Sequence, residues 1–149
     1  MEQLSKIDGP TVVTASWFSD LPPDIVRVSI TRGTRRGQRG YRRLPLLAPG
    51  PWFRSVQEEE YIRRYTNQLE GLDPQQVYRR LSECAGGAPT VALLCFERAG
   101  TDDGWCHRAL AGAWLSKALD MPVPEYGYAV LPQEQHPMLP PSLRLSKSD

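Results

Sequence analysis

The chain lacks any long apolar run. No stretch approaches the ~20 apolar residues that cross a bilayer, and the first residues, MEQLSKIDGP, lack the basic and apolar regions of a secretory signal. We therefore expect a cytoplasmic protein with no membrane partner. The 149 residues are 40% apolar and 23% charged, which suits one compact domain.

The chain also lacks the common catalytic signatures. It has no GxxxxGK[ST] phosphate loop, no GxGxxG fingerprint, no GxSxG elbow and no HExxH motif. It has three cysteines, an odd number, and no CxxC pair, so free thiols in a reducing compartment are the simplest interpretation. No cofactor is expected from these patterns.

Acidic residues are missing between residues 25 and 57, although the whole chain carries a net charge of only +1. That segment instead carries a series of arginines, among them Arg32, Arg35 and Arg36. Such a basic field attracts phosphates and is also common on solvated loops. A nucleotide or nucleic acid is therefore an expected partner, with a plain solvated loop as the alternative.

The order of the predicted elements is that of an α/β domain. Strand patterns cover Thr11–Ala15, Asp24–Ile30 and Thr90–Phe96, with an edge strand at Met121–Pro124. Helical patterns start at Ser55, at Asp73 and near Cys106, and residues 33–52 have the composition of a long loop. We expect a single three-layer, Rossmann-like domain over residues 1–130 with a small, mainly parallel sheet. The proline-rich tail, residues 131–149, is expected to be mobile or to wrap around the domain.

In a parallel sheet the carboxyl ends of the strands share one edge, where ligands of open α/β sheets bind. The residues expected there are Ser16, Trp17, Arg32, Cys95 and Glu97. Trp17 would stack on a base, and Arg32 with its neighbouring arginines would steer phosphate. Glu97 would be partly desolvated and is open as general base, ribose ligand or ion-pair partner.

A second cluster, Cys106-His107-Arg108, stands at a predicted helix start. A helix N-terminus favours anions and lowers a thiol pKa, so Cys106 is a candidate thiolate and Arg108 a candidate anion clamp. His107 would act as acid, base or donor. The alternative is structural: a buried cysteine, a structural histidine, and an arginine that pairs with Glu97.

A Cys3His zinc site is the nominal metal hypothesis. Cys84 is excluded because a strand of about six residues, roughly 20 Å, separates it from Cys95. Cys95, Cys106 and His107 with Glu97 remain possible ligands, but no CxxC-type pair supports them, so no metal site is predicted.

The pattern Cys95-Phe96-Glu97, followed after a loop by Cys106-His107-Arg108, resembles the bacterial family known as domain of unknown function 488. The resemblance extends over roughly Thr11 to Tyr128. It implies a compact α/β fold and no established reaction. The first strand continues here into Ala15-Ser16-Trp17 in place of the family's Gly-His-Ser-like turn, so a role for that histidine does not carry over.

Three hypotheses follow from these residues. The leading one is a small nucleotide- or nucleic-acid-directed enzyme of the hydrolase or glycosidase type, in which Glu97, Cys106 and His107 react and Arg108 holds an anion. The first alternative is a non-catalytic module that binds nucleic acid or, through an aromatic loop, another protein. The second is a thiol-redox protein, because Cys95 and Cys106 could approach closely enough to pair.

Overall fold

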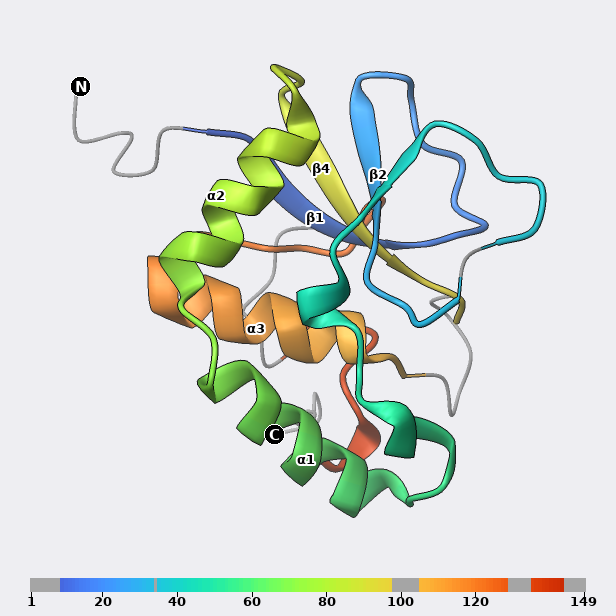
Figure 1. Cartoon of the computed structure of the whole chain (residues 1–149), viewed down its shortest axis with the longest axis vertical. Coiled ribbons are helices and arrows are strands. Elements are labelled where there is room, and N and C mark those ends of the chain that lie inside the picture. Colours follow the sequence, from blue (N-terminus) through green and yellow to red (C-terminus); the bar gives the residue numbers. More distant parts are fainter. Residues whose placement is uncertain (1–8, 34, 98–104, 129–134, 144–149) are drawn as a thin grey trace.

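The computed structural model describes residues 9–33, 35–97, 105–128 and 135–143 (Figure 1). A four-stranded sheet has the order β1-β4-β2-β3, and all of its neighbouring pairs are parallel. The strands are β1 (Thr11–Ser16), β2 (Ile25–Ser29), β3 (Tyr41–Arg43) and β4 (Thr90–Cys95). The expected α/β fold with a small parallel sheet is confirmed.

Three helices pack against this sheet: α1 (Glu58–Glu70), α2 (Pro74–Ala85) and α3 (His107–Leu119). The predicted start of α2 is confirmed, since the Asp73 side chain accepts a hydrogen bond from the Gln75 amide and Pro74 opens the helix. The predicted start of α1, with Ser55 as its N-cap, is wrong. The Ser55 hydroxyl donates to the carbonyl of Trp52 in a preceding 3-10 turn, and α1 begins three residues later, at Glu58, with Gln57 as its N-cap.

The helices gather on one face of the sheet, where the larger core forms from their apolar sides and from alternate strand residues such as Val12, Val91 and Leu93. The opposite face carries a second, smaller core around Ala15, Ala92 and Leu94. No described helix contributes to it. Residues 17–24, which connect β1 to β2, cover this core and contribute the buried side chains of Trp17 and Leu21. The layer on this face of the sheet is therefore formed by a loop and not by a helix.

Two expectations about the remaining segments need correction. The region 33–52, expected to be a loop, contains strand β3 and a 3-10 turn at Pro45–Leu47. The edge strand expected at Met121–Pro124 is absent from the described chain. Proline lacks the N–H that a β-ladder needs, so this segment pairs with β1 only through a single bridge between Thr14 and Glu125. Two hydrogen bonds flank the bridge, from Thr14 N to Pro124 O and from Tyr126 N to Thr14 O.

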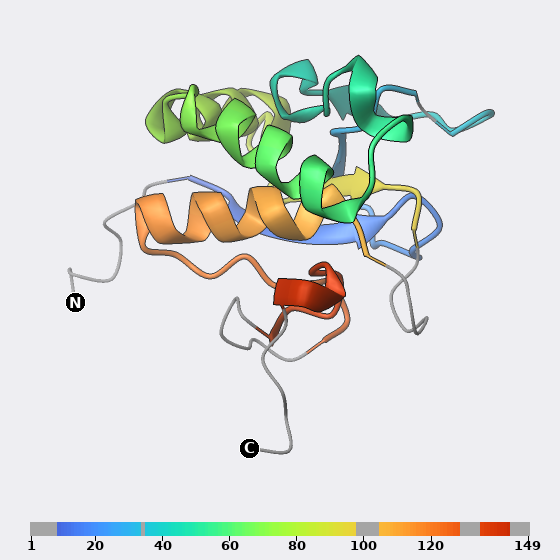
Figure 2. The same ribbon diagram turned by 90° about the horizontal axis from the view of Figure 1, so that it is seen from below.

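Part of the proline-rich tail lies against the domain. Figure 2 shows α3 between the other two helices and the C-terminal segment, residues 135–143. His136 and Met138 are buried, and the Met138 carbonyl accepts a hydrogen bond from the Cys106 amide at the start of α3. The rest of the predicted tail lies outside the described residues. Within the described chain, no helix has the length and apolar character needed to cross a membrane.

Candidate functional site

A cavity of 640 Å³ opens at the carboxyl edge of the sheet, where the ends of β2 and β4 meet the first turns of α1 and α3. Its volume is that of a small-molecule site. Of the predicted site residues, those that line it are Arg32, Cys95, Glu97, Cys106 and His107. Those that do not are Ser16, Trp17, Arg35, Arg36 and Arg108.

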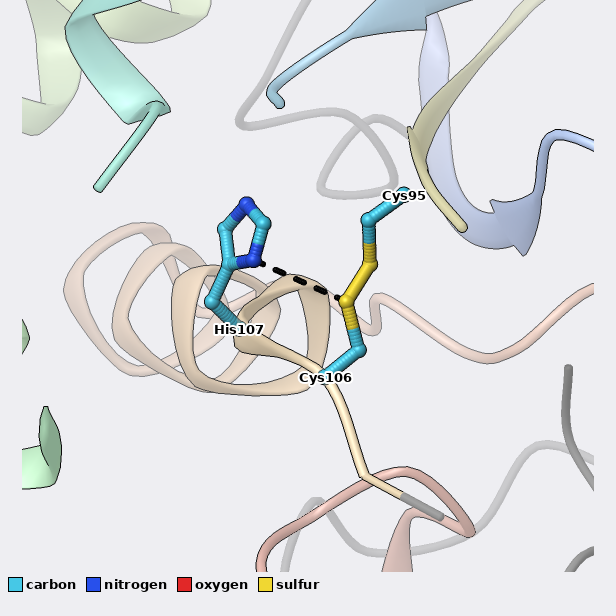
Figure 3. Close-up of side chains that lie close together, drawn as sticks. All are labelled: Cys95, Cys106 and His107. Carbon is cyan, nitrogen blue, oxygen red and sulfur yellow. Dashed lines mark hydrogen bonds between the residues drawn. A yellow bond between two sulfur atoms is a disulfide. The ribbon is translucent and has the colours of Figure 1, made fainter. Parts of the chain in front are cut away.

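Two cysteines form part of the cavity wall. Cys95 is the last residue of β4 and Cys106 is the N-cap of α3, and a disulfide joins their sulfurs (Figure 3). Their Cα atoms are 7.0 Å apart, at the outer limit of the separations that disulfides span. The expectation of free thiols is therefore wrong for this pair, because the fold brings a strand end and a helix start together. Among the described cysteines, it holds only for Cys84.

His107 is buried beside this pair, and its two ring nitrogens have different partners. Nε2 lies 2.6 Å from the carbonyl oxygen of Ile30, and Nδ1 lies 3.6 Å from Cys106 Sγ (Figure 3). A carbonyl only accepts hydrogen bonds, so Nε2 carries the proton and Nδ1 turns its lone pair toward the sulfur. Burial, assisted by the charge of Arg108 and opposed by the bond to Ile30, lowers the pKa of His107 to about 4. The imidazole is therefore neutral near pH 7.

Arg108 does not hold an anion in the cavity, which corrects the sequence-based expectation. Its side chain is fully buried, with Nε 3.0 Å and Nη2 2.7 Å from the two carboxylate oxygens of Glu125. Nη1 donates to Cys95 Sγ at 3.2 Å and to the backbone carbonyl of Glu97 at 2.8 Å. All three nitrogens of the guanidinium are thus engaged inside the protein, and its carboxylate partner is Glu125 rather than Glu97.

Glu97 is exposed at the cavity mouth, so the expected partial desolvation of its carboxylate is wrong. The strand ends at Cys95, and the chain has already left the sheet when it reaches Glu97. Its negative charge still acts on a neighbouring residue of the cavity wall, Tyr61. Burial raises the pKa of Tyr61, and the charge of Glu97 adds a smaller increase. Glu97 is available to bind or to act on a ligand at the rim.

Sequence reasoning missed a buried polar network behind the cysteines. The Met138 amide donates to His136 Nδ1 at 3.0 Å, which leaves the proton on His136 Nε2, 2.7 Å from Thr14 Oγ1. Thr14 in turn donates to Glu125 Oε1 at 2.7 Å, and Glu125 binds Arg108. The available signal was weak: Thr14, a polar residue between the apolar residues Val13 and Ala15 of strand β1. The network ties the C-terminal segment to the arginine that contacts Cys95.

Trp17 belongs to the smaller core on the opposite face of the sheet, and neither it nor the predicted residues Ser16, Arg35 and Arg36 lines the cavity. Trp17 is 0% exposed and packs edge-on against Tyr41 at 5.2 Å between ring centroids, so it cannot stack on a base. Arg35 donates to the Trp17 carbonyl and lies over Phe18. The Ser16 hydroxyl donates to the Phe96 carbonyl. Arg36 is exposed, away from the cavity lining.

The cavity has a second arginine that the sequence analysis did not single out. Arg32 and Arg54 both lie over the ring of Phe53, with guanidinium carbons 5.9 and 5.2 Å from its centroid. All three residues line the cavity. This aromatic and cationic wall, defined by Arg32, Phe53 and Arg54, borders the same cavity as the two cysteines and His107.

Comparisons of the chain with protein-family models, with curated proteins and with solved structures found no match. The resemblance to domain of unknown function 488 therefore stays a prediction. The function has to be argued from the geometry of the cavity.

Proposed function

We propose that the protein is a thiol–disulfide oxidoreductase whose reactive pair is Cys95 and Cys106. The observation that carries the proposal is the bonding of these two cysteines to each other in the wall of a cavity of small-molecule size. A disulfide with a purely structural role needs no cavity beside it, no neighbouring base and no buried cation. This pair has all three, in the cavity itself, His107 and Arg108.

The direction of attack follows from the contacts of the two sulfurs. Cys95 Sγ accepts a hydrogen bond from Arg108 Nη1, which stabilises negative charge on that sulfur, so Cys95 is the better leaving group. Cys106 Sγ faces the lone pair of His107 Nδ1. An incoming thiol therefore attacks Cys106, while His107 accepts its proton.

The reaction balances with a small thiol as reductant. The first thiol loses its proton to His107 and forms a mixed disulfide with Cys106, while the bond between the two cysteines breaks and its electron pair stays on Cys95. A second thiol passes its proton to the Cys95 thiolate and attacks the sulfur of the first. This attack forms the product disulfide and releases Cys106, to which His107 returns the first proton. Two thiols thus become one disulfide, and the protein gains two electrons and two protons.

The test is turnover of a small disulfide with a small thiol as electron donor. We expect Cys95→Ser and Cys106→Ser to abolish turnover, because neither can form the internal bond. His107→Gln should lower the rate by about 10²-fold, the scale of a lost acid–base group. Cys84→Ser is the matched control, since Cys84 lies on α2 away from the cavity lining, and it should retain full activity. Equal turnover by the wild type and by Cys106→Ser would refute the proposal.

A second candidate function is supported by the wall of Arg32, Phe53 and Arg54. Two cations and a half-buried aromatic ring in the cavity wall suit a ligand with both phosphate and a ring, such as a nucleotide, and Glu97 at the rim would serve as general base. This form of the hydrolase hypothesis no longer uses Trp17 or Arg108. Hydrolysis of nucleotide substrates that survives in Cys106→Ser but is lost in Glu97→Gln would favour it. Binding without turnover that weakens steeply with salt would indicate the non-catalytic module instead.

A further inference from the structure

We infer that the reduced protein binds a zinc ion through Cys95 Sγ, Cys106 Sγ and His107 Nδ1, with the fourth position of the metal open to the cavity. The three donor atoms lie within 4.8 Å of one another, and all three residues are buried. The inference uses the same cysteines as the proposed redox function but does not require redox turnover.

The spacing of the donors fits tetrahedral zinc. Bonds of about 2.3 Å to sulfur and 2.0–2.1 Å to nitrogen, at the tetrahedral angle, place a sulfur and a nitrogen about 3.6 Å apart. Cys106 Sγ and His107 Nδ1 lie 3.6 Å apart. Two zinc-bound sulfurs are about 3.8 Å apart by the same reasoning, a separation that the two cysteines reach by side-chain rotation once their bond is reduced.

The histidine is already prepared as a ligand. Its Nε2–H donates to the Ile30 carbonyl, which orients the ring and leaves Nδ1 as the coordinating atom. Metal-bound histidines characteristically donate their second ring N–H to a carboxylate or a backbone carbonyl in this way.

Charges around the sulfurs also favour a metal in the reduced state. Two buried thiolates would repel each other, and a divalent cation between them cancels their charge. Arg108 Nη1, 3.2 Å from Cys95 Sγ, supplies the outer hydrogen bond that steadies a thiolate ligand. The soft sulfur donors select zinc over the hard cations Mg²⁺ and Ca²⁺.

The site would be of the catalytic rather than the structural class. Within the described part of the chain, the group of donors contains three residues and no fourth. All three border the cavity, so water or a substrate atom would complete the coordination, as in Cys2His catalytic zinc sites.

Metal binding and the disulfide exclude each other, because both use the same two sulfurs. Oxidation by a small disulfide would convert the two zinc-bound thiolates into the Cys95–Cys106 bond, release Zn²⁺, and reduce the oxidant to two thiolates. The oxidised wild-type protein is therefore its own negative control. It needs no substitution and avoids the question of whether a variant folds.

The experiment measures zinc bound to the full chain after reduction with a phosphine and removal of adventitious metal by a chelator. We expect one zinc per chain in the reduced wild type, none after oxidation, and one in reduced Cys84→Ser. Cys106→Ser and His107→Gln, checked for native circular dichroism, should each bind zinc at least tenfold more weakly. Cobalt in place of zinc should give the visible absorption of a tetrahedral thiolate complex in the reduced wild type only.

The inference is overturned if the reduced wild type binds no zinc, or if Cys84→Ser loses zinc while Cys106→Ser retains it. Its failure is distinguishable from failure of the proposed function. Disulfide turnover without zinc binding overturns the zinc site alone. Zinc binding that disappears on oxidation, in a protein with no disulfide turnover, supports the zinc site and removes the oxidoreductase.

Discussion

Replacing Glu125 by glutamine should strongly destabilise the protein, because it removes the counter-charge of a buried arginine. Arg108 is 0% exposed and Glu125 is 4% exposed, and two hydrogen bonds join them. Removing one partner of a buried ion pair costs about 3–5 kcal/mol, since the remaining charge is left uncompensated in a poorly polarisable interior.

The amide cannot restore the lost contacts in either orientation. Arg108 offers Nε to one carboxylate oxygen and Nη2 to the other, so a glutamine must turn its NH2 group toward one of these donors. The amide oxygen can accept from only one of Nε and Nη2, and the other two acceptors, Cys95 Sγ and the Glu97 carbonyl, both bind Nη1, so one of the two nitrogens is left unpaired. A loss of about 3–5 kcal/mol corresponds to a fall in Tm of about 6–20 °C in a chain of this size.

The assay is urea unfolding followed by circular dichroism, under reducing conditions so that the disulfide does not contribute. The double variant Arg108→Met with Glu125→Leu removes the charges together and should be more stable than Glu125→Gln alone. Glu60→Gln is the surface control, because Glu60 pairs with Arg63 and Arg64 in solvent, and it should leave the midpoint unchanged. A loss of less than about 1 kcal/mol in Glu125→Gln would refute the reasoning.

The remaining predictions concern titration, packing and capping. Because the pKa of His107 falls from 6.5 to about 4 on folding, the unfolded chain takes up this proton first as the pH falls. Stability should therefore be complete above pH 6.5 and decline by about 3 kcal/mol between pH 6.5 and 4; urea unfolding across this range should show a shallower decline in His107→Gln. Trp17→Ala should cost about 3–5 kcal/mol in the same assay, whereas a ligand-stacking role would leave stability unchanged. Asp73→Ala should cost about 1 kcal/mol through loss of the α2 cap, and Asp73→Asn should restore most of it; equal losses in the two variants would contradict the capping role.

Elements with strong local signals were predictable from the sequence. The central strand was expected at Thr90–Phe96 and is found at Thr90–Cys95, because an uninterrupted apolar run can be buried only in the middle of a sheet. Strand β3 was missed because two of its three residues are exposed arginines. Only its pairing with β2, a tertiary contact, makes this segment a strand.

The residues of the candidate site were predictable where chain order places them, and not where a tertiary contact does. Chain order alone placed Arg32, Cys95 and Cys106 at one edge of a parallel sheet, and these residues do share the cavity. The face of the sheet on which Trp17 would lie depends on the path of the connection after β1, which no local pattern reveals. The partner of Arg108 was hidden too, because Glu125 follows a proline in a segment whose position is set by its bridge to Thr14.

The central position of β4 has a consequence for how the protein is made. Within the described chain, both neighbours of β1 come later in synthesis: β4 pairs along its whole length, and Glu125 bridges to Thr14. β2 pairs with β4 on one side and with the short strand β3 on the other, so it too lacks its longer partner until β4 is synthesised. A nascent chain that ends before residue 90 thus holds an apolar first strand without its partner, and we expect it to be exposed to chaperones and to aggregation until β4 emerges from the ribosome.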